Sequence, residues 1–438
     1  MLRIALPLAL AELGWMSMGV VDTIMVGRLP ESALAIGATS VGGALFYGFA
    51  IFGLGLMSGL DTLVSHAWGA GDLPEARRSM RAGLILAACF TAPLMAGVLG
   101  LAPLLARIGV EAPVVREATG FVQVLVWSMP LLLLYSVARR YLQGIHCVRP
   151  VAWALISSNL INAAGNWILI YGRLGAPHMG IRGSALSTVI SRVYLAAFLV
   201  ISVRKRDPHA FHAPRVQFAH LRNLLRLGLP AAFAIGFEVW VFNLVTALAA
   251  TLDPVSLAAH TIALNAASVT YMVPLGISSA AAVSVGHARG AQNPREAARS
   301  GWHAIGLAAA FEIFSAVSFL VFPRQIARIY TEDPQIVAVS IRLLAIAAAF
   351  QMFDGLQATT SGALRGLADT RTPMIVTLIA YWVVGLPLGC WLCYHAHWGI
   401  FGIWWGLCLS LFLIAGGLLP VWARNASVIP IPAASRPA

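Results

Sequence analysis

The 438 residues are 59% hydrophobic and only 11% charged, with a mean hydropathy of +0.81. Soluble domains carry about 25% charged residues, so this composition excludes a soluble globular protein and predicts a polytopic membrane protein. The net charge of +12 comes from 28 arginines and one lysine, mostly in short loops between apolar runs. That distribution follows the positive-inside rule and argues against nucleic-acid binding.

Twelve apolar runs account for most of the chain, and about 20 apolar residues suffice to cross a bilayer. The expected fold class is therefore an all-α polytopic membrane protein with twelve transmembrane helices. The first run resembles a signal peptide, but Glu12 interrupts it and no clear A-x-A cleavage site follows, so we assign it to a membrane helix. The expected spans are 4–27, 35–65, 81–105, 118–138, 151–171, 182–203, 224–250, 258–285, 300–323, 337–362, 373–395 and 399–422.

The loops between these spans carry unequal positive charge. Twenty arginine and lysine residues lie on the side that includes the N-terminus, and eight lie on the other side. Because cytoplasmic loops hold the excess of positive charge, both termini are expected in the cytoplasm.

An internal repeat relates the two halves of the chain. SHAWGAGDLPEARRS (65–79) matches GHARGAQNPREAARS (286–300) at a constant offset of 221, with eight of fifteen positions identical. Six helices per half place both halves in the same orientation, as in transporters built from parallel repeats around a central cavity. The capping residues in both loops predict short cytosolic helices there. The expected divisions are an N-lobe (1–203), a basic cytosolic linker (204–223), a C-lobe (224–423) and a cytosolic C-terminal tail (424–438).

Carboxylates inside the spans are the main functional signal, because a charge at the centre of a membrane helix costs about 2.5–3.5 kcal/mol. Glu12 and Asp61 lie near helix ends, where a structural role is expected, and no partner is identifiable for the deeper Glu312. Three acids lie deep, and Arg192 is the only base at comparable depth in an expected span. We interpret them as sites for a proton, a metal cation or an organic cation. The three are Asp22, Glu238 and Asp354.

Two asparagines add a polar group to the fifth span. Asn162 and Asn166 are four residues apart and therefore share one helix face. Their amide groups could complete a site for sodium or a protonated acid, or could merely join helices. The residues alone leave both interpretations open.

The five cysteines fall in or beside apolar segments, which argues against a disulfide framework. Cys390, Cys393, His395 and His397 resemble a metal site by spacing. They lie at the end of an apolar helix next to tryptophans, so no bound metal or cofactor is expected beyond a coupling Na⁺ or H⁺.

Eight stretches, in this order and spacing, resemble the multidrug and toxic compound extrusion (MATE) transporters, in particular their NorM-like branch. The stretches are VDTIMVGRLP (21–30), VSHAWGAG (64–71), NAAGNWILIYG (162–172), FEVWVF (237–242), AAHTIALN (258–265), VGHARGAQN (285–293), DGLQATTSGALRG (354–366) and AYWVVGLPLG (380–389). The resemblance covers essentially the whole chain.

The resemblance implies two six-helix lobes that export cationic and aromatic compounds in exchange for Na⁺ or H⁺. It places the C-lobe acids on Glu238 and Asp354, and a bend of the first helix at Pro7. The chain departs from the family pattern at two positions. Phe350 stands where relatives can have a tyrosine, and Asn166 stands where some relatives have an acid. It places the N-lobe coupling-ion or proton site on Asp22, Asn162, Asn166 and Thr188.

Aromatic faces near the acids could hold a cationic substrate through cation–π attraction, although each could instead serve packing. The implied partners are the lipid bilayer, organic cation or drug substrates, and Na⁺ or H⁺. The implied location is a bacterial inner membrane, where the protein is expected to act as a monomer. The candidate aromatic residues are Phe237, Trp240, Phe350, Phe353, Tyr381 and Trp382.

Two other functions remain as alternatives. A flippase for lipid-linked precursors shares this general architecture, but its anionic substrate requires positive charge in the cavity, and here deep acids outnumber deep bases. A membrane-embedded enzyme requires a nucleophile–base pair, a metal signature or a phosphate loop, and the sequence shows none of these. We therefore expect a transporter and no enzyme.

Overall fold

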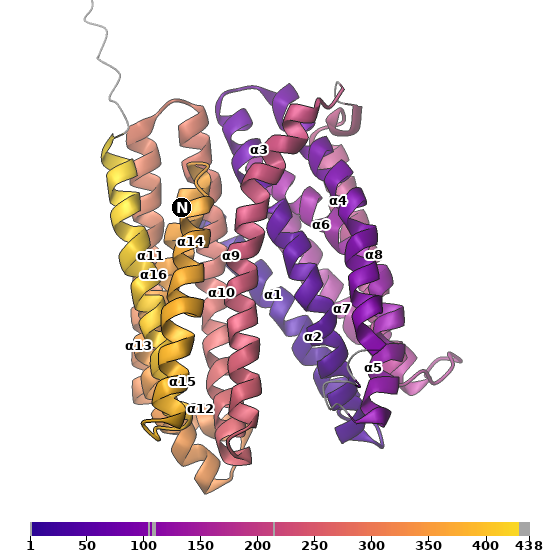
Figure 1. The fold of residues 1–438 in the computed structure, drawn as a ribbon. Helices are drawn as coiled ribbons and strands as arrows, with labels where there is room; N and C mark the ends of the chain where they lie inside the picture. Colours follow the sequence, from indigo (N-terminus) through magenta and orange to yellow (C-terminus); the bar gives the residue numbers. More distant parts are fainter. Residues whose placement is uncertain (1, 104–105, 107–110, 213–214, 429–438) are drawn as a thin grey trace, which may run out of the picture. The chain divides into compact units, whose positions relative to one another are not determined.

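The computed structural model describes residues 2–103, 106, 111–212 and 215–428, which are almost entirely helical and contain no strand (Figure 1). The helices are α1 (Leu2–Val26), α2 (Ser32–Met57), α3 (Gly59–Gly69), α4 (Leu73–Leu101), α5 (Ala112–Leu125), α6 (Met129–Gly144), α7 (Arg149–Tyr171), α8 (Ile181–Arg206), α9 (Phe218–Ala250), α10 (Pro254–Gly290), α11 (Pro294–Val321), α12 (Pro323–Tyr330), α13 (Pro334–Gly366), α14 (Arg371–Leu378), α15 (Leu386–Tyr394) and α16 (Ile400–Val428).

Eleven of the described helical segments are long and apolar enough to cross a membrane. The fifth expected span, α7, falls outside this set although its 23 residues are long enough. Its three asparagines, at 159, 162 and 166, lower its hydropathy. The all-α polytopic fold class is confirmed.

The expected short cytosolic helices in the repeat loops are not separate elements, so that prediction was wrong. Leu73 and Pro294 begin the long helices α4 and α11, which continue into the apolar segments. Arginine and alanine favour helix, and no breaker separates them from the apolar run, so the helix propagates. The structure also adds the short helix α12 and interrupts the second span at Ser58.

Three helices in the second half begin with the same local signal. Asp253, Asn293 and Asp333 each precede a proline at the first helical position, and each side chain accepts a hydrogen bond from a backbone N–H of the first turn. Such caps satisfy otherwise unpaired donors, and proline there loses no helical bond. These signals fix where α10, α11 and α13 begin.

Contacts divide the chain into two compact units. We call residues 10–60 and 73–232 the N-terminal unit, and residues 1–9, 61–72 and 233–438 the C-terminal unit.

Three of these borders lie within helices, namely α1, α3 and α9. The borders in α1 and α9 each fall two residues after a proline, and these prolines belong to the pairs Leu6-Pro7 and Leu229-Pro230, one in each half of the chain. Proline removes one backbone hydrogen bond from a helix interior, so both helices have a weak point there. A hinge at Pro7 remains a prediction.

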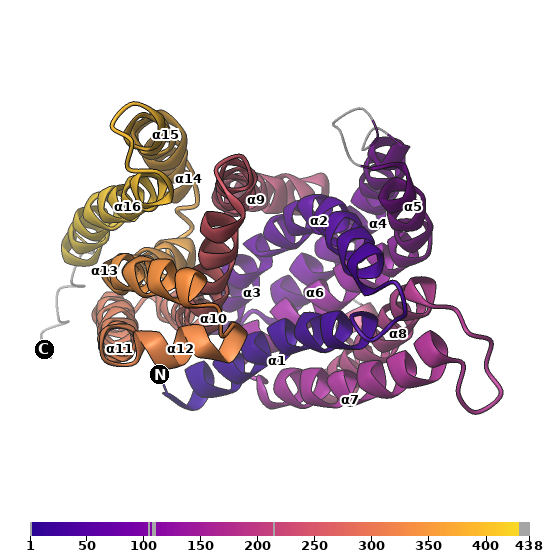
Figure 2. The same ribbon diagram turned by 90° about the horizontal axis from the view of Figure 1, so that it is seen from below.

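Within the C-terminal unit, α13 is the central helix. It packs against α10, α11 and α16 (Figure 2). In the N-terminal unit, α8 packs against α6 and α7, and α2 packs against α4 and α5. The acids of the C-lobe therefore lie on or beside a helix that is covered by protein on several sides.

Matched residues of the two repeats contact one another within the C-terminal unit. A Cβ atom on Gly69 would overlap the backbone of His287, and a Cβ atom on Gly290 would overlap the backbone of His66. His66 corresponds to His287, and Gly69 to Gly290, at the offset of 221 residues. Helices α3 and α10 thus meet in a reciprocal contact, the arrangement that a local two-fold axis produces.

Gly69→Ala should lower the stability of the protein, because the added methyl group forces apart two helix backbones. Overpacking of this kind costs about 1–3 kcal/mol. We expect a lower apparent melting temperature of the detergent-solubilised protein by intrinsic fluorescence. Gly306→Ala is the matched control, since nothing lies within 4 Å of its Cβ position. Equal melting temperatures for the two variants would contradict the close contact.

The linker after α8 begins with a polar anchor at Asp207. Arg77 donates two hydrogen bonds to its carboxylate, at 2.8 Å and 2.6 Å, and the Tyr141 hydroxyl donates a third at 2.6 Å. Burial alone would raise the pKa of Asp207, but these hydrogen bonds outweigh burial and hold the pKa below its usual value. The anchor ties the end of α8 to α4 and α6.

Asp207→Asn should lower the apparent melting temperature at pH 7, because the Arg77 guanidinium loses its carboxylate. A carboxylate with a lowered folded-state pKa stabilises the protein above its unfolded pKa of about 3.9, and this contribution is lost as the pH falls further. The gap between wild type and variant should therefore narrow below about pH 4. Melting curves across pH test this, with the exposed Glu332→Gln as control. A gap that stayed constant down to the lowest pH would contradict it.

Candidate functional site

Two of the six acids in the spans have fixed basic partners. Glu12 on α1 forms an ion pair with Arg139 on α6, and both side chains are buried. Asp61 on α3 lies 3.7 Å from Arg365 on α13. The expected span 118–138 ends just before Arg139, but in the structure α6 continues to Gly144 and includes this residue. These two acids are neutralised by the protein itself.

The other four acids have no basic side chain within 4 Å among the described residues. Asp354 and Glu312 are buried, and the other two are half-buried. An ionised carboxylate in the membrane interior requires a counter-charge, water or a proton. The unpaired acids are Asp22, Glu238, Glu312 and Asp354.

The N-terminal unit brings together the four residues expected for its site. Asn166 donates a hydrogen bond of 2.5 Å to Asp22 Oδ1, and Thr188 lies 3.3 Å from Asp22 Oδ2. Asn162 Oδ1 lies 3.3 Å from the same Asn166 amide nitrogen, so both asparagines do share one face of α7. Asn166 Oδ1 has no hydrogen-bond partner among the described residues. Asp22 therefore lies within a small polar cluster.

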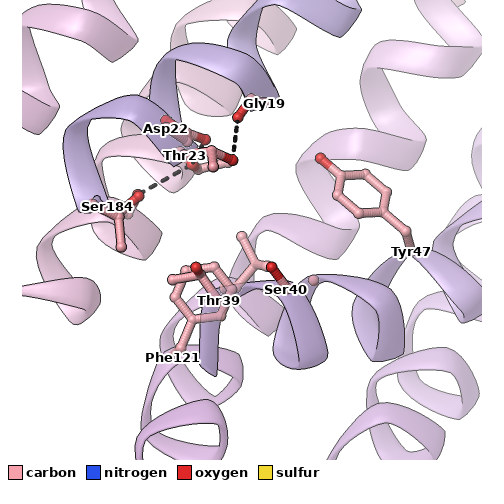
Figure 3. A pocket seen from close by; sticks show the side chains of 12 residues that line it. Gly19, Asp22, Thr23, Thr39, Ser40, Tyr47, Phe121 and Ser184 are labelled. Carbon is pink, nitrogen blue, oxygen red and sulfur yellow. Dashed lines mark hydrogen bonds between the residues drawn. The ribbon is translucent and has the colours of Figure 1, made fainter. Parts of the chain in front are cut away.

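A pocket of about 140 Å³ opens beside Asp22. In Figure 3, Asp22 and Thr23 lie on one side, and Thr39, Ser40 and Phe121 lie opposite. Drug-sized ligands occupy pockets of about 300–1,000 Å³, so this space suits an ion and its water better than a drug. Carboxylate and hydroxyl oxygens are suitable ligands for a hard cation.

Arg192 contacts Tyr47, which lines this pocket, and its guanidinium is surrounded by aromatic rings. Its guanidinium carbon lies 4.9–5.8 Å from the ring centres of Trp15, Phe46 and Tyr47. The guanidinium donates to Ser128 Oγ at 2.5 Å and to the Tyr47 hydroxyl at 2.9 Å. Cation–π contact and hydroxyl acceptors stabilise the charge without a direct bond to Asp22.

The C-terminal unit has a second carboxylate site. Gln357 on α13 donates a hydrogen bond of 3.1 Å to Glu238 Oε2 on α9, and the Tyr271 hydroxyl bonds the same carboxylate. Asp354 lies three residues before Gln357, one turn away on the same helix face. Asp354 Oδ1 has no hydrogen-bond partner among the described residues. The two C-lobe acids are therefore linked through a single turn of α13.

The candidate aromatic residues separate into two groups. Phe350 and Tyr381 are buried, and both pack edge-on against Phe242. Phe353 packs edge-on against Phe412.

The remaining three aromatic residues lie on the α9 segment around Glu238 or contact it. Trp240 is 37% exposed and lies beside Phe237, with ring centres 6.1 Å apart. Trp382, in a π-helical turn between α14 and α15, donates a hydrogen bond of 3.1 Å to the Phe237 carbonyl. Such turns occur often at functional sites. These side chains form an aromatic group on and beside the α9 segment that carries Glu238.

Sequence reasoning missed several side chains of these sites. Gln357 and Tyr271 bond Glu238, and Thr39 and Tyr47 line the pocket beside Asp22. The only available sequence signal was the spacing of Gln357 from Asp354, which places both on one face of α13. The others come from helices whose contacts depend on tertiary packing.

The family comparison matches both halves of the chain. The model of the MatE family matches residues 7–168 and again residues 230–391. The chain is 36% identical to "Probable multidrug resistance protein NorM" of Mesorhizobium japonicum, covering 98% of this chain and 94% of the relative. It is also 36% identical to "Multidrug resistance protein NorM" of Burkholderia vietnamiensis, covering 98% and 95%.

Solved structures of similar fold share less sequence. The eukaryotic MATE transporter AtDTX14 superposes with a TM-score of 0.88 at 22% identity, covering 98% of this chain and 97% of that one. An outward-facing MATE family transporter of the MOP superfamily gives 0.89 at 20% identity, covering 98% and 95%. These similarities support the fold.

Proposed function

The chain belongs to the MATE family of multidrug transporters, and we propose that it exports cationic and aromatic compounds in exchange for Na⁺ or H⁺. The curated relatives are named as multidrug resistance proteins. Substrate class and coupling ion are the parts of this proposal that the residues of the two sites support.

The observation that carries the proposal is the set of acids without fixed basic partners. Asp22, Glu238 and Asp354 each have at least one oxygen that bonds only polar neutral groups or nothing among the described residues. A carboxylate with a permanent arginine partner cannot exchange cations, as with Glu12 and Arg139. A carboxylate held by amides and hydroxyls can bind one cation and release another.

The N-terminal site fits the coupling ion. Its pocket of about 140 Å³ is too small for a drug, and its lining includes the oxygen-bearing side chains of Asp22, Thr23, Thr39, Ser40, Tyr47, Ser184 and Thr188. The residues fit either sodium, through these oxygens, or a proton on the Asp22 carboxylate. Arg192 donates a hydrogen bond to the Tyr47 hydroxyl and forms no ion pair with Asp22, so the Asp22 carboxylate has no basic partner among the described residues.

The C-terminal site fits an organic cation as well as an ion. Glu238 supplies the negative charge, and Phe237 and Trp240 on the same segment of α9 are the aromatic residues we propose for contact with the substrate. A cation over an aromatic face gains about 0.5–2 kcal/mol, which adds to the attraction of the carboxylate. Compounds that combine positive charge with an aromatic system would gain from both contacts.

One exchanged ion per cycle supplies enough free energy for useful export. An elementary charge that crosses 100 mV releases about 2.3 kcal/mol, which supports roughly a 50-fold substrate gradient. Binding of the ion at Asp22 or at the C-lobe acids would favour the state that releases substrate outward. We propose alternating access as the means, with Pro7 as a hinge.

A flippase for lipid-linked precursors is the main alternative. Its anionic substrate requires unpaired basic side chains in the membrane. The deep arginines of the described part of the chain have partners: Arg139 has Glu12, Arg365 has Asp61, and Arg192 has its surrounding aromatic rings. Among the described residues of the spans, four acids lack a basic partner whereas Arg192 lacks an acidic one, so the charge without an oppositely charged partner is mainly negative, which favours a cationic substrate.

The excess of arginine and lysine in alternate loops supports a cytoplasmic position for both termini. We propose the inner membrane of a bacterium as the location, with the bilayer as the solvent of the apolar surface. The proposed working unit is a monomer, because each chain carries both carboxylate sites.

The proposal predicts that drug efflux requires each of three acids. Asp22→Asn, Glu238→Gln and Asp354→Asn should each reduce ion-driven efflux of a fluorescent organic cation at least about tenfold, since losing a charge interaction costs more than 1.4 kcal/mol. Efflux is measured in proteoliposomes under separately imposed sodium and pH gradients. The gradient that drives wild-type efflux identifies the coupling ion.

Glu332→Gln removes an exposed acid between α12 and α13 and should leave efflux unchanged. Wild-type rates in all three acid variants would overturn the exchange mechanism. Transport of lipid-linked precursors without any efflux of cationic dyes would favour the flippase.

A further inference from the structure

We propose that Glu312 on α11 forms a further cation-binding position in the C-terminal unit, together with Gln351 on α13, and that it takes a proton or a sodium ion. The inference rests on the proposed exchange function, and it adds a third carboxylate to the C-lobe acids. Neither the sequence pattern nor the comparisons assign a role to this residue.

Glu312 lies deep in the membrane-spanning part of α11. It follows Pro294, the first residue of the helix, by 18 residues, or about 27 Å along the axis. Its side chain is fully buried, with an exposure of 0%. Neither carboxylate oxygen has a hydrogen-bond partner among the described residues. Buried polar groups nearly always have partners, so two unpaired oxygens on one acid indicate a missing ligand.

The absence of a side chain at Gly355 on α13 leaves space for this carboxyl group. Gly355 lies opposite Glu312, and a Cβ atom there would be 3.2 Å from Oε1 and 3.3 Å from Cδ, and closer still to Cγ. Any larger residue at 355 would therefore displace the Glu312 side chain. Because Gly355 directly follows Asp354, the space that holds the Glu312 side chain lies one residue from that acid of α13.

Gln351 provides a second unpaired oxygen at the same helix interface. Its amide nitrogen donates to Ser315 Oγ at 3.0 Å and to the Thr270 hydroxyl. These two bonds fix the amide and leave Gln351 Oε1 without a partner among the described residues. Ser315 lies three residues after Glu312 on α11, so the amide and the carboxyl group are one helical turn apart.

Successive turns of α13 therefore carry side-chain oxygen atoms that accept no hydrogen bond from the described residues. Gln351, Asp354 and Gln357 follow one another at intervals of three residues, and each has an oxygen without a partner in the described structure. Carboxylate and amide oxygens are ligands that suit Na⁺, and a proton would neutralise the carboxylate directly. Glu312 extends this row to α11, as Glu238 extends it to α9 through its bond to Gln357.

A purely structural acid would have a different environment. Glu12 forms an ion pair with Arg139, and the amide nitrogen of Gln351 donates hydrogen bonds to two hydroxyl groups. Glu312 has neither arrangement, although leucine or alanine would fill the position with apolar atoms. Its position beside Gly355 supports a role in binding an exchangeable ion.

The test uses the full-length protein in proteoliposomes and measures the number of ions exchanged per molecule of a fluorescent organic cation. The stoichiometry follows from the drug gradient at which net flux reverses, under a fixed membrane potential. Glu312→Gln should exchange one positive charge fewer per drug molecule, so the drug gradient it sustains should fall by about tenfold or more. Runs with a sodium gradient at constant pH, and with a pH gradient without sodium, show which ion occupies Glu312.

Gly355→Ala tests the same position without changing any charge. The added methyl group should displace the Glu312 side chain and lower the stoichiometry as Glu312→Gln does. In a Glu312→Ala background, which leaves space opposite residue 355, the same substitution should have no further effect. Gly306→Ala on α11, whose Cβ would meet nothing within 4 Å, is the control.

The outcomes separate the two proposals. If wild-type protein shows no ion-driven efflux, the proposed function itself fails. If wild type exchanges normally and Glu312→Gln keeps the full stoichiometry, the function stands and the role of Glu312 is overturned. An effect of Gly355→Ala that persists without Glu312 would likewise contradict the inference.

Discussion

The structure depends on one constraint: a carboxylate in the membrane interior must meet a positive charge, a proton or water. The protein meets it in two ways. Glu12 and Asp61 receive arginine partners from neighbouring helices, and they join those helices. Asp22, Glu238, Asp354 and Glu312 receive only amides and hydroxyl groups, or no donor at all among the described residues. The paired acids join helices and so stabilise the fold, whereas the acids without basic partners are the ones we propose to exchange cations.

The internal repeat explains how two such sites arise in one chain. Each half begins with a Leu-Pro pair in a long helix, and matched glycines let the segments that contain His66 and His287 approach closely. Asp22 lies on the first helix of one half, and Glu238 lies on the first helix of the other. Both acids follow the proline of their helix, by 15 and 8 residues. Bending at either proline would move the acid that follows it relative to the chain before it.

The sequence predicted the fold class and the acids, because both depend on composition and periodicity. The spacing of Asn162 and Asn166 placed them on one face, whereas Asp22 and Thr188 joined them only through family resemblance. Arg139 was misplaced because α6 runs beyond its apolar part. The arginine partners of Glu12 and Asp61, and the space that Gly355 provides, could not be predicted. Each depends on which helices pack together, and no local pattern encodes that.

The central claim is that the unpaired acids exchange one cation for another. Equilibrium binding of a fluorescent organic cation to the purified protein tests it most directly, with Na⁺ titrated at constant pH and pH varied without Na⁺. The account predicts that one of the two ions displaces the dye from wild-type protein, and that Glu238→Gln with Asp354→Asn abolishes this competition. Dye binding that is independent of both ions would contradict the account.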